Sequence, residues 1–119
     1  MHTRAVVAAC LLCGLTGCAS LRSDEWRIVA VSAVCADVAL TTHAINRGAV
    51  ERNPILGVRP TPAKLVAINA VVIAAIWVAS RHMAETDKAS LWKWTAILHA
   101  GFAAWNAQQV ASSGAPQRP

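Results

Sequence analysis

Charged side chains are scarce in this 119-residue chain: Asp, Glu, Lys and Arg make up 14% of the residues, whereas 55% are hydrophobic. An ordinary soluble domain carries about a quarter charged residues, so the composition argues against a well-solvated globular surface. Intrinsic disorder is excluded as well, because it requires low hydrophobicity and high net charge. The length suffices for one small domain. These limits indicate a membrane protein or a small helical bundle tied to a membrane.

The chain also lacks the patterns that nucleic-acid binding and common catalytic sites require. Its 11 Lys and Arg residues are spread out, Tyr is absent, and the five Trp and one Phe form no base-stacking pattern. No glycine-rich phosphate loop, Ser-His-Asp order or HExxH motif is present. The sequence therefore predicts no nucleic-acid partner, no cofactor, no metal site and no catalytic residue, and an enzyme is the less favoured class.

A short apolar segment at the N-terminus follows a basic residue and ends in the sequence LTGC, whose cysteine is Cys18. The segment is short for a membrane span but has the length of a signal-peptide core. Its ending resembles a bacterial lipobox, where the chain is cut before a cysteine that carries diacylglycerol. The resemblance implies a lipoprotein-type signal peptide over 1–17 and lipidation of Cys18. An uncleaved anchor helix over 5–21 is the alternative.

The four cysteines do not indicate disulfides or a metal knuckle. Cys10 and Cys13 leave with the predicted signal peptide, and Cys18 takes the lipid. Cys35 then stands alone in an apolar run, so neither a zinc site nor a redox pair is expected.

Three apolar stretches follow a short stalk at 18–27, and each is close to the ~20 residues that a helix needs to cross hydrocarbon. The stretches cover about 28–45, 63–80 and 91–110. They are rich in Ala and lack period-two alternation, which argues against strands. We therefore expect an all-α fold, a three-helix transmembrane bundle over 28–111, with a flexible tail at 112–119.

The basic residues predict an orientation. The densest cluster lies between the first two stretches, at Arg47, Arg52, Arg59 and Lys64. The positive-inside rule places this loop in the cytoplasm, so the processed N-terminus lies outside. We expect the protein in the bacterial inner membrane. A lipid-tethered periplasmic bundle at the outer membrane is the alternative. Ala19 follows the predicted lipidated cysteine, and an Asp at that position would resemble a signal for retention in the inner membrane.

Polar residues interrupt the apolar stretches, where charge is costly. Asp37 and Thr41 share one face of the first helix, whereas His99 and Asn106 share a stripe of the third, because offsets of four and seven return to the same side. Asn69 is the only interior polar side chain of the second. A bundle can turn Asp37, Asn69 and His99 toward one another. They form either a hydrogen-bond clasp, which we favour, or a proton- or ligand-binding pair of Asp37 and His99.

Two further patterns leave alternatives open. Trp26, Trp77, Trp92 and Trp94 fall near the outer ends of the stretches, where indoles prefer the membrane interface, although core packing is the alternative. His82-x-x-Glu85 has the spacing of two metal ligands on one helix face, but a lone pair in a charged loop is more typical of a solvated surface.

One combination of residues is familiar: Asp37 and Thr41 in the first apolar stretch, then the loop ERNPILG at 51–57, then two more apolar helices. It resembles a family of small bacterial membrane proteins of unknown function. The resemblance implies three helices in a membrane and no established activity. It singles out one set of residues, which either act together or shape the loop: Asp37, Thr41, Glu51, Asn53 and Pro54.

The sequence thus predicts a structural or interaction component of the bacterial envelope. Its expected partners are membrane lipid and either another envelope protein or a second copy of the chain. One alternative is a small transporter- or enzyme-like membrane unit that uses Asp37 and His99 with Glu51. Another is a holin-like pore former.

Overall fold

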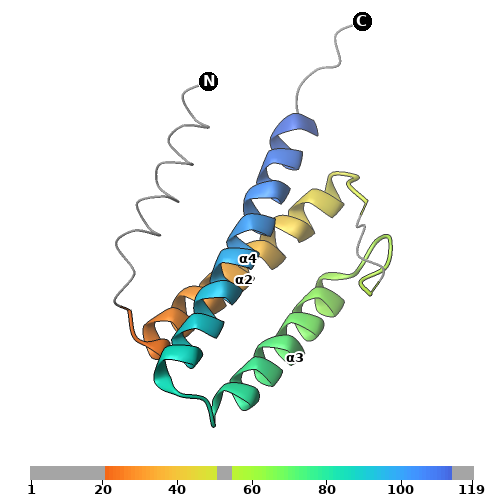
Figure 1. The fold of residues 1–119 in the computed structure, drawn as a ribbon. Helices are drawn as coiled ribbons and strands as arrows, with labels where there is room; N and C mark the ends of the chain where they lie inside the picture. Colours follow the sequence, from red (N-terminus) through yellow and green to blue (C-terminus); the bar gives the residue numbers. More distant parts are fainter. Residues whose placement is uncertain (1–20, 51–54, 114–119) are drawn as a thin grey trace, which may run out of the picture.

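A computed structural model describes residues 21–50 and 55–113, and all regular secondary structure in these ranges is helical. The helices are α2 (Ser23–Asn46), α3 (Pro62–Ser80) and α4 (Glu85–Ser113). The chain runs up α2, down α3 and up α4, so α2 and α4 are parallel (Figure 1). The predicted all-α, three-helix fold is confirmed.

Several predicted features lie outside the described residues. They are the signal peptide, its lipidation site Cys18, and the loop residues Glu51, Asn53 and Pro54. The last residues of the predicted tail, 114–119, lie outside them as well.

Local chemistry explains where the helices stop and start. At the end of α2, Gly48 has a φ of 93°, which a glycine adopts without strain. The N–H of Ala49 donates to the carbonyl of Ala44 at 3.0 Å, so carbonyls of the last turn are satisfied. At the start of α3, the hydroxyl oxygen of Thr61 accepts from the N–H of Lys64 at 3.2 Å, and Pro62 follows at the first helical position.

Two helices begin earlier than the apolar stretches predict. α2 starts at Ser23 rather than at 28, because the carboxylate of Glu25 accepts from the N–H of Arg22 at 2.8 Å and closes the first turn. α4 starts at Glu85 rather than at 91, which shortens the preceding connection to 81–84. α4 also continues to Ser113, so helix covers the first two positions of the predicted tail.

The core lies where the first halves of α2 and α4 meet. It consists of Trp26 and Ala30 from α2 and Trp92 and Ala96 from α4. Ala30 is 0% exposed, since a small side chain at this point lets the two helices approach closely. α3 packs less extensively, and only Leu65 and Ser80 among its residues are buried. The molecule is therefore an α2–α4 pair with a more loosely attached α3.

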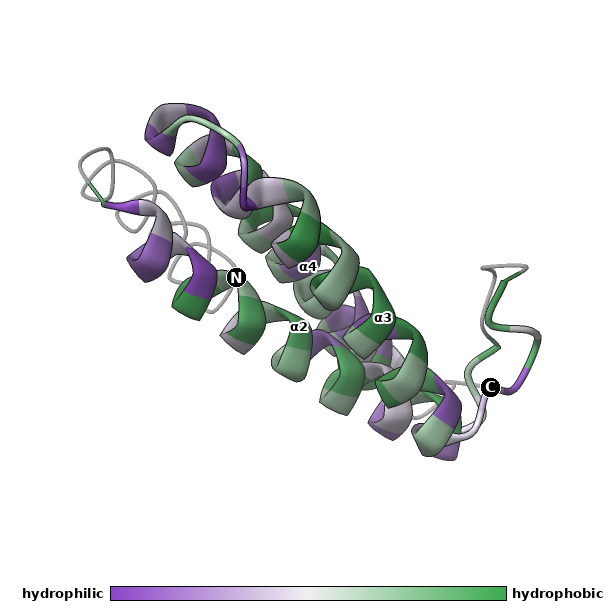
Figure 2. Cartoon of the chain, turned by 90° about the horizontal axis from the view of Figure 1, so that it is seen from below, coloured by the Kyte–Doolittle hydropathy of each residue, from purple (hydrophilic) through white to green (hydrophobic). Residues whose placement is uncertain are grey.

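The outer surface of the bundle is largely apolar. Figure 2 shows that hydrophobic residues predominate along α3 and through the middle of α2, with hydrophilic residues nearer the helix ends. The exposed side chains include Ile28, Val71, Trp77, Trp94 and Trp105. Within the described ranges, α2 and α3 are long and apolar enough to cross a membrane. These two helices point to membrane association.

The tryptophans divide between the two predicted environments. Trp26 and Trp92 are buried in the core, whereas Trp77 and Trp94 are exposed. The indole of Trp77 is covered by the guanidinium of Arg81, which lies 4.6 Å from the ring centroid. Core packing therefore describes Trp26 and Trp92, whereas Trp77 is exposed near the end of α3 and Trp94 is exposed further inside α4.

Candidate functional site

A polar cluster of four side chains joins the middle of α2 to α4. Asp37 and Thr41 are one turn apart on α2, and His99 and Asn106 are two turns apart on α4. Nδ1 of His99 lies 2.9 Å from Oδ2 of Asp37. Nδ2 of Asn106 donates to Oδ1 of Asp37 at 3.2 Å and to Oγ1 of Thr41 at 2.7 Å. The Thr41 hydroxyl donates to Oδ1 of Asp37 at 3.3 Å.

The chemistry of the carboxylate fixes the orientation of its partners. When Asp37 is a carboxylate it only accepts hydrogen bonds, and Nδ1 of His99 then carries the proton of their contact. The same reasoning places the amide nitrogen of Asn106, rather than its oxygen, against Asp37. With Asp37 as the acceptor, Thr41, His99 and Asn106 each donate to it.

The cluster is enclosed between the helices. Asp37 and Thr41 are buried, and the ring of Phe102 meets that of His99 edge-on at 6.1 Å. Among the described residues, no buried side-chain nitrogen or oxygen lacks a hydrogen-bond partner. A polar group buried without partners would destabilise the bundle, and this arrangement avoids that cost.

Asn69 does not join the cluster. Its amide nitrogen donates to the carbonyl of Leu65 on its own helix at 2.9 Å. α3 lies apart from the α2–α4 pair at this level, so the amide satisfies itself locally (Figure 1). Asn106, which the sequence placed on the same stripe as His99, occupies the third position instead.

A cleft of about 950 Å³ separates α3 from the α2–α4 pair beside this cluster. Asp37, His99 and Asn106 line one side of it, and Asn69 lines the other. The remaining walls are mostly apolar side chains from all three helices and from the loop before α3. Asn69 and the cluster therefore line the same cleft without contacting each other.

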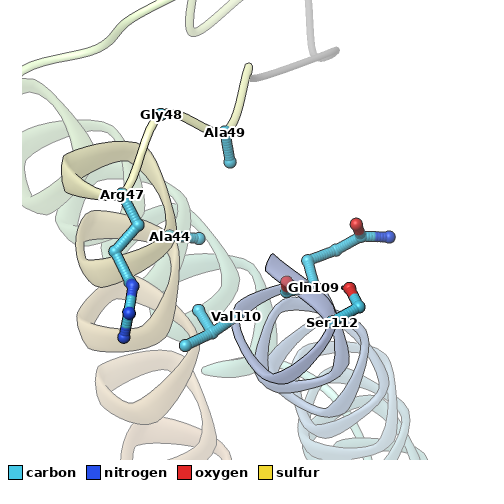
Figure 3. Close-up of a pocket in the computed structure, with 7 residues that line it drawn as sticks. All are labelled: Ala44, Arg47, Gly48, Ala49, Gln109, Val110 and Ser112. Carbon is cyan, nitrogen blue, oxygen red and sulfur yellow. Dashed lines mark hydrogen bonds between the residues drawn. The ribbon is translucent and has the colours of Figure 1, made fainter. Parts of the chain in front are cut away.

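A smaller pocket of about 260 Å³ lies between the C-terminal ends of α2 and α4. Figure 3 shows Ala44 and Val110 facing this space, with Gln109 and Ser112 on the α4 side. The C-terminal, negative ends of both helix dipoles point toward this pocket and disfavour anions despite the nearby Arg47. The larger cleft is the better candidate site.

A second polar contact between the helices lies at their N-terminal ends. The backbone N–H of Ser23 donates to Oε1 of Glu85 at 2.8 Å, and its hydroxyl donates to Oε2 at 2.9 Å. The backbone hydrogen bond and then the hydroxyl lower the pKa of Glu85 below its ordinary value of 4.5, because both stabilise the carboxylate. Glu85 thus caps the start of α2.

This contact replaces the metal pair that the spacing of His82 and Glu85 allows. Within the described residues, no group of three or more His, Cys, Asp or Glu side chains is placed to hold a metal ion. The signal that could have revealed the contact is an early start of α4, which sets Glu85 in its first turn.

Glu85→Gln is expected to weaken the pH dependence of stability below about pH 4.5. The pKa of Glu85 is lowered in the folded state, so its contribution is complete above the ordinary value and is lost as the pH falls through the folded value. The measurement is the midpoint of thermal unfolding in detergent between pH 7 and pH 3. Asp87→Asn, an exposed change in the same turn, should keep the wild-type profile. Identical profiles for all three proteins would contradict the assignment.

Comparison with known proteins finds no matching family model, no similar curated protein and no similar solved structure. The resemblance to small bacterial membrane proteins stays a prediction from the sequence. The site is interpreted from its own geometry.

Proposed function

We propose that this chain is a small protein of the bacterial envelope, held in the inner membrane by three helices, with a structural or interaction role. The observation that carries the proposal is the division of its surfaces. Apolar side chains are exposed on all three helices, and the polar side chains inside α2 and α4 meet one another. Such a surface suits hydrocarbon, whereas a soluble monomer rarely exposes large apolar patches.

α4 fits this proposal although its composition is less apolar than that of α2 and α3. Four exposed side chains follow one stripe of the helix: Trp94, Leu98, Phe102 and Trp105. His99 and Asn106 lie on the neighbouring face and bond across to α2. The polar residues that lower the hydropathy of α4 therefore need not contact lipid.

The cluster supports a structural role more than a chemical one. Every hydrogen-bond partner of Asp37 is a side chain of this same bundle. The partners are Thr41, His99 and Asn106. Interhelical hydrogen bonds of this kind contribute about 0.6–2 kcal/mol each in membrane bundles and fix the register of the helices. The cluster serves as a clasp between α2 and α4.

The proposal includes an orientation and partners. Arg47, Arg59 and Lys64 lie around the loop that joins α2 to α3, which the positive-inside rule places in the cytoplasm. The N-terminus is then outside, with a lipid on Cys18. The partners are membrane lipid and either another envelope protein or a second copy of the chain.

Membrane fractionation tests this proposal. The protein should sediment with the inner membrane and resist extraction by alkaline carbonate. Removing three apolar helices into water exposes apolar surface at ~25 cal/mol per Å², which opposes release. Recovery in the outer-membrane fraction would contradict the proposal and favour a lipid-tethered periplasmic bundle. Overexpression should also leave the membrane potential intact, whereas a holin-like pore former would collapse it.

Cys18→Ser is expected to abolish incorporation of labelled fatty acid and to leave an unprocessed precursor. The reason is that only a cysteine thiol at the predicted cleavage site takes the diacylglycerol. Cys35→Ser is the matched control, because Cys35 is an exposed free cysteine within α2. It should keep both labelling and processing. Labelling that persists in the Cys18 variant would refute lipidation at this position.

A further inference from the structure

Three polar side-chain atoms of the residues that line the cleft form no hydrogen bond with the described part of the bundle. These are Nε2 of His99 and the amide oxygens of Asn69 and Asn106. Nδ1 of His99 and the two amide nitrogens form the hydrogen bonds described above. Among the described residues, no group bonds to these three atoms, and no buried polar side-chain atom lacks a partner. The three atoms are therefore accessible, and their residues all line the cleft.

All three atoms are hydrogen-bond acceptors. The amide nitrogens of Asn69 and Asn106 face a backbone carbonyl and a carboxylate, which only accept, so the free atom of each amide is its oxygen. Nδ1 of His99 carries the proton that faces Asp37, which leaves Nε2 with a lone pair in the singly protonated ring. The cleft thus calls for a ligand that donates hydrogen bonds.

The charges around the cleft also favour a cation. Among the described residues, Asp37 is the only acidic one that lines it, and no Lys or Arg does. Phe102 and Trp105 are exposed and line the same cleft, and aromatic rings attract cations through their negative faces. A carboxylate ligand would meet repulsion from Asp37 and find no Lys or Arg partner among the described lining residues.

We propose that this cleft binds an amphipathic amine, with its ammonium group toward Asp37, His99 and the two amide oxygens. The apolar body lies along the α3 wall, which Ile68 and Val72 line. A volume of about 950 Å³ accommodates such a molecule. The ammonium group belongs either to the head group of an aminolipid or to a free long-chain amine. The proposal is independent of lipidation at Cys18.

The test compares octylamine, which is charged at neutral pH, with octanoate, which has the same chain and the opposite charge. The full chain is placed in phosphatidylcholine nanodiscs, and the ring Cε1–H resonance of His99 is followed by NMR. Octylamine should produce a saturable shift of this resonance. Octanoate should bind at least about tenfold more weakly, because it lacks donors and carries the charge of Asp37. An equal response to both compounds, or no saturable response to octylamine, would overturn the proposal.

Matched variants on α3 locate the site. Val72 lines the cleft and is 41% exposed, whereas the adjacent Val71 is 68% exposed and does not line it. Val72→Trp should fill the cleft and abolish the octylamine shift, and Val71→Trp should leave it unchanged. Asn69→Leu removes one acceptor without touching the clasp, and should weaken binding by about threefold to tenfold. An undiminished shift in Val72→Trp would place binding elsewhere and overturn the proposal.

Repeating the octylamine titration in nanodiscs of a second lipid composition distinguishes the two sources of the ammonium group. If phosphatidylethanolamine head groups occupy the cleft, nanodiscs that contain this lipid should require more octylamine for the same shift. If the natural ligand is a free amine, the titration should be the same in both compositions. Failure of these tests leaves membrane fractionation unaffected, so the binding site and the proposed envelope role are tested separately.

Discussion

Trp92→Ala is expected to lower the free energy of unfolding by about 3–5 kcal/mol, the usual cost of removing a buried tryptophan. Trp92 is 1% exposed and packs with Trp26 and Ala30 where α2 meets α4. The vacated volume would leave these side chains without contacts on one side, in water or in lipid. Thermal unfolding in detergent, followed by near-ultraviolet circular dichroism, measures the loss.

Trp94→Ala supplies the matched control two residues further along α4. Trp94 is 63% exposed, so its indole contributes little to the packing of the helices. Its replacement should change the unfolding midpoint only slightly. A similar loss in both variants would mean that the core is not where the structure places it.

Asp37→Leu is expected to destabilise the bundle, whereas Asp37→Asn should not. Leucine has no acceptor, so His99 loses its partner on α2 and Asn106 keeps only its hydrogen bond to Thr41. The loss is about 0.6–2 kcal/mol per interhelical bond. An amide oxygen at position 37 still accepts from Asn106, and the amide nitrogen can donate to His99 once the ring changes tautomer. Removal of the buried charge also lowers the desolvation cost.

The measurement pairs protein abundance and thermal stability in detergent with rescue of any deletion phenotype. Rescue by Asp37→Asn together with failure of Asp37→Leu supports the clasp and argues against proton chemistry at this residue. A stable Asp37→Asn variant that fails to rescue would contradict the structural role. It would favour the transporter- or enzyme-like alternative.

Helix periodicity was sufficient to predict which faces of the first and third helices carry polar residues. Asp37 and Thr41 recur at four residues and His99 and Asn106 at seven, so each pair had to lie on one side of its helix. Successive spans also alternate in direction, which makes the first and third helices parallel. The pairing of these faces follows, since polar groups in an apolar bundle find one another.

The position of Asn69 and the role of Glu85 could not be predicted in the same way. Periodicity predicts on which face of α3 Asn69 lies. It does not predict how closely α3 approaches the α2–α4 pair, because that depends on packing along the whole helix. Glu85 lies in a charged segment that hydropathy places outside the third helix. Its contact with Ser23 arises because α2 and α4 both begin earlier than their apolar stretches. The extra turns are polar, and hydropathy does not register them.

The parallel pairing of α2 and α4 has a consequence for biosynthesis. The partners of Asp37 on α4 are 62 and 69 residues further along the chain, so a ribosome makes them only after α2 and α3 are complete. A nascent chain that contains only its first two helices holds a carboxylate whose partners on α4 do not yet exist. Closing the clasp is then the final step of assembly.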